Sequence, residues 1–299
     1  MMQAVIGIDI GGTKISGCVL TDDYRSVQEQ VVACPANEGG AIVLRVVIDL
    51  CRSLIQQNPK FTIVAVGVGA AGQIDSEKGV VLDANENLTH WIGTPIAASI
   101  HIALNLPVFV ENDVRTMALA EYIIGAGQGY KHLLCMTVGT GIGGAIIMNG
   151  DLWHGAMFSA GEMGYIRESA TTTIESTASG IALEAQYQQQ TQRTTRIPLP
   201  IIAQRALAGD DIAQSIIDTG AKRLGATIAP IVAFLNPQAV IVGGGVPHIG
   251  DLWWQPFVTT ITHYQLKSVR QTPILKAQLG QDAGRVGAAI LTWKGLTHA

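Results

Sequence analysis

Two stretches of the sequence carry side chains suited to phosphate and proton chemistry. Asp9 and Lys14 flank a glycine pair in Asp9-Ile-Gly-Gly-Thr-Lys14, and Glu111-Asn112-Asp113 lies between an expected strand and an expected helix. A carboxylate can hold Mg²⁺ directly or through water, and an ammonium can neutralise a phosphate. Phosphoryl transfer needs positioning, a metal ion and one acceptor for the proton of the attacking hydroxyl. Asp113 suits that last role.

Asparagine and aspartate before a helix also have a structural explanation. Both are favoured N-caps because their side-chain oxygens accept hydrogen bonds from the unpaired N–H groups of the first helical turn. Capping explains one residue of Glu111-Asn112-Asp113 and is the better interpretation of that triplet taken alone. A carboxylate at the carboxyl end of a strand in an α/β protein is nevertheless well placed for chemistry.

Glycine-rich turns recur along the chain. Gly11 and Gly12 join two expected strands, Gly139-Thr140-Gly141 joins two more, and Gly243-Gly244-Gly245 follows a further strand. Glycine lets a phosphate approach backbone N–H groups closely because no Cβ is present. A single turn of this kind is best explained as the shape of a tight hairpin. Two similar hairpins and a third glycine run favour nucleotide binding.

Two of these runs match the pattern GxGxxG, at 67–72 and 139–144. That pattern binds dinucleotides only where it closes a strand and opens a helix. Here Gly72 leads into a turn-like run and Gly144 into a strand-like one. An NAD-linked oxidoreductase is therefore disfavoured, and the chain has no GxxxxGK[ST] phosphate loop.

The elements that must position these residues alternate between strands and helices, which predicts an α/β class with two lobes. The strand–glycine turn–strand unit near the N-terminus returns about 130 residues later, which suggests an internal duplication. Strands are expected at 4–10, 15–20, 62–68, 107–111, 133–138, 144–149 and 238–242, and helices at 41–57, 94–105, 114–124, 178–192 and 199–235.

Composition narrows the class of protein. The 299 residues include 48% hydrophobic and 14% charged residues, which is typical of a compact globular protein. A net charge of −4 argues against nucleic acid or an anionic membrane as a partner. The four cysteines show no metal-ligand spacing and are expected to be small buried hydrophobes. With no signal peptide evident, we expect a soluble cytoplasmic protein.

Five motifs in this order resemble the ROK family of sugar kinases and sugar-responsive repressors, over about residues 4–293. They are Asp9–Lys14, Glu111–Asp113, Thr137–Gly144, Ala160-Gly-Glu-Met-Gly164 and Val242–Gly245. The resemblance implies the two-lobed actin-like/hexokinase ATPase fold, which is ribonuclease H-like and duplicated, with ATP and sugar bound between the lobes. It implies a lobe of residues 1–118 against which a C-terminal helix at about 283–299 packs, and a larger lobe of residues 119–282.

The resemblance also assigns roles to individual residues. Asp113 resembles the catalytic base, and the sugar ligands are expected to be Asn87, Asn112, Asp113, Glu162, Tyr165 and Glu175. The phosphate loops are expected to be Gly11, Gly12, Thr13 and Lys14, and Gly139, Thr140 and Gly141, with Asp9 the candidate Mg²⁺ ligand. Gly243, Gly244 and Gly245 resemble the adenosine region.

One departure from the family pattern bears on the metal content. Most members have a histidine after the GExG motif and a CxCGxxGC loop that together bind zinc. This chain has Tyr165 at that position and no cysteine in 166–174, so a Cys₃His zinc site cannot form there. A tyrosine at this place is similar to zinc-free members that resemble β-glucoside kinases.

These features favour an ATP- and Mg²⁺-dependent kinase acting on a hexose or hexose derivative, at the 6-hydroxyl. The alternative is a catalytically weak sugar-binding or regulatory ROK protein without a DNA-binding domain, because the first strand is expected by residue 4. The resemblance implies a homodimer. His90 and His154 are given no catalytic role.

Overall fold

The computed structural model describes residues 2–85 and 87–298, and the chain divides into two compact units. Unit 1 comprises Met1–Gln128, Leu152–Ala160 and Gln281–Ala299. Unit 2 comprises Gly129–Asp151 and Gly161–Gly280. The lobe boundaries expected from the family resemblance stay a prediction. No helix in the described part of the chain is long and apolar enough to cross a membrane.

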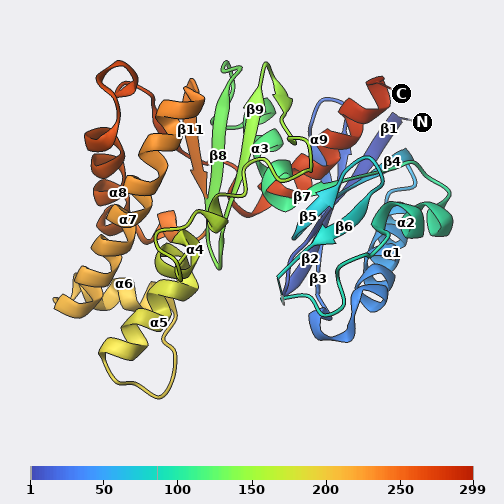
Figure 1. The fold of residues 1–299 in the computed structure, drawn as a ribbon. Helices are drawn as coiled ribbons and strands as arrows, with labels where there is room; N and C mark the ends of the chain where they lie inside the picture. The colour runs from blue at the N-terminus through green and yellow to red at the C-terminus, as the bar shows by residue number, and fades with distance from the viewer. Residues whose placement is uncertain (1, 86, 299) are drawn as a thin grey trace. The chain divides into compact units, whose positions relative to one another are not determined.

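The sheet of unit 1 has five strands in the order β3-β2-β1-β4-β7 (Figure 1). The antiparallel hairpin of β1 and β2 carries the first glycine turn, while β4 and β7 run parallel to β1. All apolar side chains from Ala4 to Ile10 are buried, which is typical of a strand covered on both faces. The bounds are β1 Met2–Ile10, β2 Lys14–Thr21, β3 Ser26–Ala33, β4 Phe61–Ala70 and β7 Val108–Asn112.

Helices α1, α2 and α9 pack against this sheet. Helix α1 (Gly40–Gln57) buries Val43, Val47, Leu50 and Leu54, whose helical spacing places them on one face. It contacts β2 and β3 and packs beside α2 (Ile96–Leu104), which contacts β7. Helix α9 (Ala283–His298) packs against β1 and β4, and α3 (Asp113–Ile124) packs against α9.

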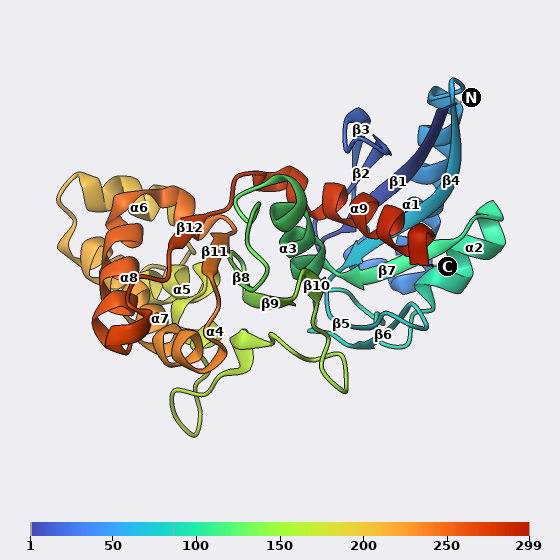
Figure 2. The same cartoon turned by 90° about the horizontal axis from the view of Figure 1, so that it is seen from above.

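Helix α9 approaches the sheet closely because glycines face it (Figure 2). A Cβ built on Gly7 of β1 would clash with the backbone oxygen of Arg285, and one on Gly67 of β4 would clash with that of Ala288. The packing is therefore backbone to backbone, and larger residues at either position would push the helix away.

Unit 2 repeats the sheet arrangement of unit 1. Its five strands have the order β10-β9-β8-β11-β12, with β8 and β9 as the antiparallel hairpin and β11 and β12 parallel to β8. The bounds are β8 Leu133–Val138, β9 Ile142–Met148, β10 Asp151–Leu152, β11 Ala239–Gly243 and β12 Ile274–Lys276. The matching strand orders show the duplication that the repeated motif suggested.

A helical layer accompanies this second sheet. Helix α7 is its centre, contacting α4, α5, α6 and α8. Helices α7 and α8 pack closely at Gly225, where a Cβ would lie 2.8 Å from the backbone oxygen of Phe257. The bounds are α4 Ile174–Ala178, α5 Gly180–Gln190, α6 Leu199–Leu207, α7 Asp211–Leu235 and α8 Asp251–Tyr264.

The sequence prediction did not include helix α8 or strand β12, and it differs from the structure in three further places. The helix expected over 199–235 is divided, because Gly209 adopts a φ of +96° and Asp210 caps α7 through Ala213 N. The turn-like run after Gly72 contains a short hairpin of β5 (Gln73–Asp75) and β6 (Val80–Asp83). Strand β3 was not predicted, because it lies at the edge of the sheet and its many polar residues give no apolar run of the kind that marks a buried strand. Neither GxGxxG run opens a helix.

Candidate active site

The first glycine turn closes tightly and presents Asp9 and Lys14 from adjoining strands. Gly11 N donates to the carbonyl oxygen of Lys14 at 3.0 Å, and Lys14 Nζ donates to Gln281 Oε1 at 2.8 Å. The carboxylate of Asp9 lies against the first turn of α9, where a Cβ on Gly284 would be 2.7 Å from Asp9 Cγ. Burial raises the pKa of Asp9 to about 6, although Lys14 and Arg285 oppose that rise.

Asn87 lies beside the same turn. A Cβ on Gly12 would be 3.7 Å from both the Cβ and the backbone oxygen of Asn87, and the Asn87 side chain is exposed. The structure thus brings together a predicted sugar ligand and a predicted phosphate loop within unit 1.

Asn112 caps helix α3 with its side chain. Its Oδ1 accepts from Val114 N at 2.9 Å and from Arg115 N at 3.2 Å. Its Nδ2 donates to the carbonyl oxygen of Gly72 and to Asp113 Oδ1, each at 2.9 Å. The amide therefore uses both hydrogens and two acceptor positions within the protein. The capping interpretation of the sequence is correct for Asn112, and its sugar-binding role stays a prediction.

Asp113 is the first residue of α3 and is partly buried. Its Oδ1 accepts from Asn112 Nδ2 and from Val114 N, both at 2.9 Å. A carboxylate in the first turn of a helix is stabilised by the N–H groups and the dipole there. These contacts fix the orientation of the side chain that we expect to be the base.

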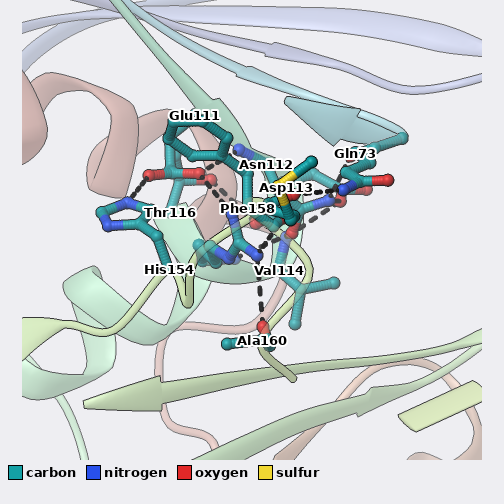
Figure 3. A network of polar contacts seen from close by, with 12 residues as sticks. Gln73, Glu111, Asn112, Asp113, Val114, Thr116, His154, Phe158 and Ala160 are labelled. Carbon is teal, nitrogen blue, oxygen red and sulfur yellow. Dashed lines mark hydrogen bonds and ion pairs between the residues drawn. The ribbon is translucent and has the colours of Figure 1, made fainter. Parts of the chain in front are cut away.

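A cluster of polar side chains lies at the junction of β7 and α3, as Figure 3 shows for Glu111 and His154. Glu111 Oε1 is 3.2 Å from Arg115 Nη1, and Glu111 Oε2 is 2.5 Å from His154 Nε2. The side chains of Glu111 and Arg115 are 1% and 2% exposed. From the sequence, neither Glu111 nor Arg115 was assigned an individual role, and His154 was given no catalytic role. The feature of the sequence that could have indicated this cluster is a charged residue, Arg115, within an otherwise apolar helical run.

The second glycine turn and the triple glycine lie side by side in unit 2. Gly139 N donates to the carbonyl oxygen of Gly141 at 2.9 Å, and a Cβ on Gly139 would be 3.9 Å from Gly245 N. Gly244 has a φ of +92° and lies against the backbone of Val138. Parallel pairing of β8 with β11 places both loops at the same edge of the sheet. Position 244 requires glycine because its φ is positive and because a Cβ there would clash with the backbone of Val138.

Glu175 joins the second turn to the predicted sugar-binding segment. Its Oε2 accepts from Ile142 N at 2.7 Å, and a Cβ on Gly164 would be 3.1 Å from the same oxygen. Glu162 precedes the 3₁₀ turn η2 (Met163–Tyr165), and Tyr165 is 67% exposed. Unit 2 therefore gathers Gly139–Gly141, Gly243–Gly245 and Glu175, with Gly164 of η2 adjoining the Glu175 carboxylate.

The donor chemistry at Asp9 suits a magnesium ion. Asp9 offers a carboxylate oxygen beside a turn with backbone N–H groups, which suits Mg²⁺ carried by a nucleotide phosphate. Within residues 2–85 and 87–298, no group of three or more His, Cys, Asp or Glu side chains could hold a metal ion alone. A phosphate-bound ion that needs one protein ligand is compatible with that finding.

A duplicated α/β sheet with a glycine hairpin in each copy, and an acidic strand end beside one of them, defines a nucleotide-binding protein of the actin-like ATPase class. The ROK family profile matches residues 5–294. The chain belongs to the ROK family.

Three known proteins are similar to it over nearly their whole length. A glucokinase of Halalkalibacterium halodurans is 30% identical, covering 96% of this chain and 94% of its own. A ROK hexokinase from Thermus thermophilus superposes with a TM-score of 0.88 at 29% identity, covering 99% of this chain and 100% of its own. A ROK glucokinase from Streptomyces griseus, solved with glucose and AMPPNP, gives 0.83 at 32% identity, covering 96% and 98%.

Proposed function

We propose that this protein transfers the γ-phosphoryl group of ATP to the 6-hydroxyl of a hexose or hexose derivative, with Asp113 as general base. Membership of the ROK family, together with whole-length similarity to glucokinases, makes it an ATP-dependent sugar kinase. The observation that carries the finer assignment is the position of Asp113, oriented at the junction of β7 and α3 by Asn112 Nδ2 and Val114 N.

Unit 1 supplies the base and one phosphate loop in this proposal. Asp113 accepts the proton of the attacking hydroxyl, and Asn87 and Asn112 contribute to the sugar site. Gly12 and Thr13 receive phosphate oxygens through backbone N–H groups of the turn that Gly11 closes, and Lys14 through its ammonium. Charge that develops on the transferred group is thereby stabilised by donors already in place.

Unit 2 supplies the second phosphate loop, Gly139–Gly141, and the adenosine region, Gly243–Gly245. Glu162, Tyr165 and Glu175 contribute to the sugar site. Carboxylates suit sugars because each can accept hydrogen bonds from two vicinal hydroxyls. Tyr165, where most family members have histidine, provides a phenol that can donate or accept.

Magnesium enters as the MgATP complex, and Asp9 is the proposed protein ligand. We expect no structural zinc, because Tyr165 replaces the histidine and the described residues hold no cysteine–histidine cluster. Elemental analysis of protein dialysed without chelator should give well under one zinc per chain. We also expect a cytoplasmic homodimer, which light scattering during gel filtration can test.

The substrate assignment is tested by ADP release over a panel of hexoses, N-acetylhexosamines and β-glucosides. We expect sugar-dependent turnover that requires Mg²⁺, and a product whose phosphate NMR places it on C6. Tight sugar binding by calorimetry without turnover would instead select a regulatory sugar-binding protein. Phosphorylation at another carbon would overturn the 6-hydroxyl assignment alone.

A further inference from the structure

The segment Leu152–Ala160, here termed the strap, belongs to unit 1 although unit 2 precedes and follows it in the chain. Its attachments to unit 1 are polar. Gln73 Nε2 donates to the carbonyl oxygen of Met157 at 2.5 Å, and His154 contacts Glu111. Arg115 Nη2 donates to the carbonyl oxygens of Phe158 at 2.7 Å and Ala160 at 3.1 Å.

The backbone of the strap is strained where Arg115 holds it. Phe158 has a φ of +57°, in the left-handed region that bulky residues rarely adopt. Such a conformation persists only where the surroundings impose it, and it points to a functional constraint. Phe158 also makes an edge contact with the His154 ring, at 6.1 Å between centroids.

The same guanidinium also contacts Glu111, two residues before the predicted base in the sequence. Arg115 Nη1 contacts Glu111, and Arg115 N donates to the capping Asn112. The planar fork of arginine can hold Glu111, Phe158 and Ala160 together, whereas a lysine ammonium cannot span them. Arg115 thus connects the strained turn of the strap to Glu111 at the end of β7. Figure 3 shows Glu111, Asp113, Phe158 and Ala160 in the same view.

We propose that Arg115, held by Glu111, is a positioning residue for sugar binding. It fixes the left-handed turn of the strap against the β7–α3 junction of unit 1, where Asn112 and Asp113 are the predicted sugar ligands. This inference rests on the proposed kinase function, and it names a determinant of sugar affinity that the base and the phosphate loops do not include.

The test compares Arg115→Lys with wild type in steady-state kinetics and amide hydrogen exchange. We expect the KM for the sugar to rise at least tenfold while the KM for ATP stays within twofold. Exchange of the amides in 155–160 should accelerate at least tenfold. Arg205→Lys is the matched control, because Arg205 donates to Tyr187 within unit 2. It should leave both measurements within twofold of wild type.

A second-site change sharpens the test. Because glycine adopts a positive φ without strain, Phe158→Gly in the Arg115→Lys background should recover part of the sugar KM, whereas Phe158→Ala should not. If Arg115→Lys fails to fold, His154→Ala carries the test, with an expected rise of about threefold in the sugar KM because His154 is a more exposed anchor.

Two results would overturn the proposal: faster exchange in the strap with an unchanged sugar KM, or unchanged exchange in the strap. Wild-type turnover over the sugar panel is measured first. If wild type phosphorylates no sugar, the kinase assignment fails by itself. The strap exchange and calorimetric sugar binding of Arg115→Lys then decide the positioning role separately.

Discussion

The carboxylate of Glu175 accepts a 2.7 Å hydrogen bond from the backbone N–H of Ile142, at the end of the second glycine turn. A residue expected to bind sugar hydroxyls therefore also orders a loop expected to bind phosphate. The two predicted functions of unit 2 share one side chain. A change that displaces this carboxylate should affect both the loop and the sugar-binding segment.

Gly141→Ala tests that shared role. The added methyl group would clash with Glu175 Oε2, so the carboxylate or the turn must move. We expect the free energy of unfolding to fall by about 1–3 kcal/mol, as for other overpacking changes. Urea denaturation measures it. Gly139→Ala is the matched control, because its nearest atom would be 3.9 Å away, and its stability should stay within about 0.5 kcal/mol of wild type.

Asp9→Asn should remove a pH dependence of stability. The pKa of Asp9 is raised from 3.8 unfolded to about 6 folded, chiefly by burial. Protonated Asp9 therefore favours the folded state below pH 3.8, and that contribution is lost as pH rises through 6. Without Mg²⁺, the variant should exceed wild type in stability at pH 8 by up to about 3 kcal/mol.

The same measurement at low pH is the internal control for Asp9. The stability difference between Asp9→Asn and wild type should shrink toward zero below pH 3.8, where Asp9 becomes protonated in the unfolded state as well as in the folded state. A constant difference across this range would contradict the buried carboxylate. Mg²⁺ at pH 8 should stabilise wild type more than the variant, because the metal needs the ionised oxygen.

Phe158 offers a direct measure of backbone strain. Phe158→Ala keeps the cost of a positive φ and removes the ring, whereas Phe158→Gly removes both. The glycine variant should therefore be more stable than the alanine variant by about 1 kcal/mol, the usual cost of a left-handed L-residue. Thermal unfolding of the pair decides the matter. Equal stability, or a more stable alanine variant, would show that the turn is not strained in solution.

The sequence predicted the elements that carry a regular apolar pattern, a repeated glycine turn or a helix N-cap. Apolar runs such as 4–10 and the helical spacing of Val43 and Val47 gave β1 and α1 within a few residues. The repeated glycine turn predicted the duplicated sheet, because a hairpin of this shape requires residues without a Cβ. Capping by Asn112 was also predicted from the sequence, because an asparagine before a helix accepts hydrogen bonds from the N–H groups of the first turn.

Other features depend on contacts between distant residues and leave little local signal. The edge strand β3 alternates polar and apolar residues, and Val27 and Val31 are exposed. The cluster of Glu111, Arg115 and His154 joins side chains from β7, α3 and the strap. In the sequence, each of these charged or polar residues is what a solvent-exposed position would also carry. Backbone packing of α9 on Gly7 and Gly67 is likewise visible only once the helix is placed.

The central claim, that Asp113 accepts the proton of the sugar hydroxyl, is tested most directly by Asp113→Asn in single-turnover phosphoryl transfer with calorimetric sugar binding. An asparagine preserves the shape of the side chain but cannot take up the proton. The account predicts a rate at least 10²-fold lower, the range typical of a lost general base, with the sugar Kd within about threefold. A rate close to that of wild type would contradict it.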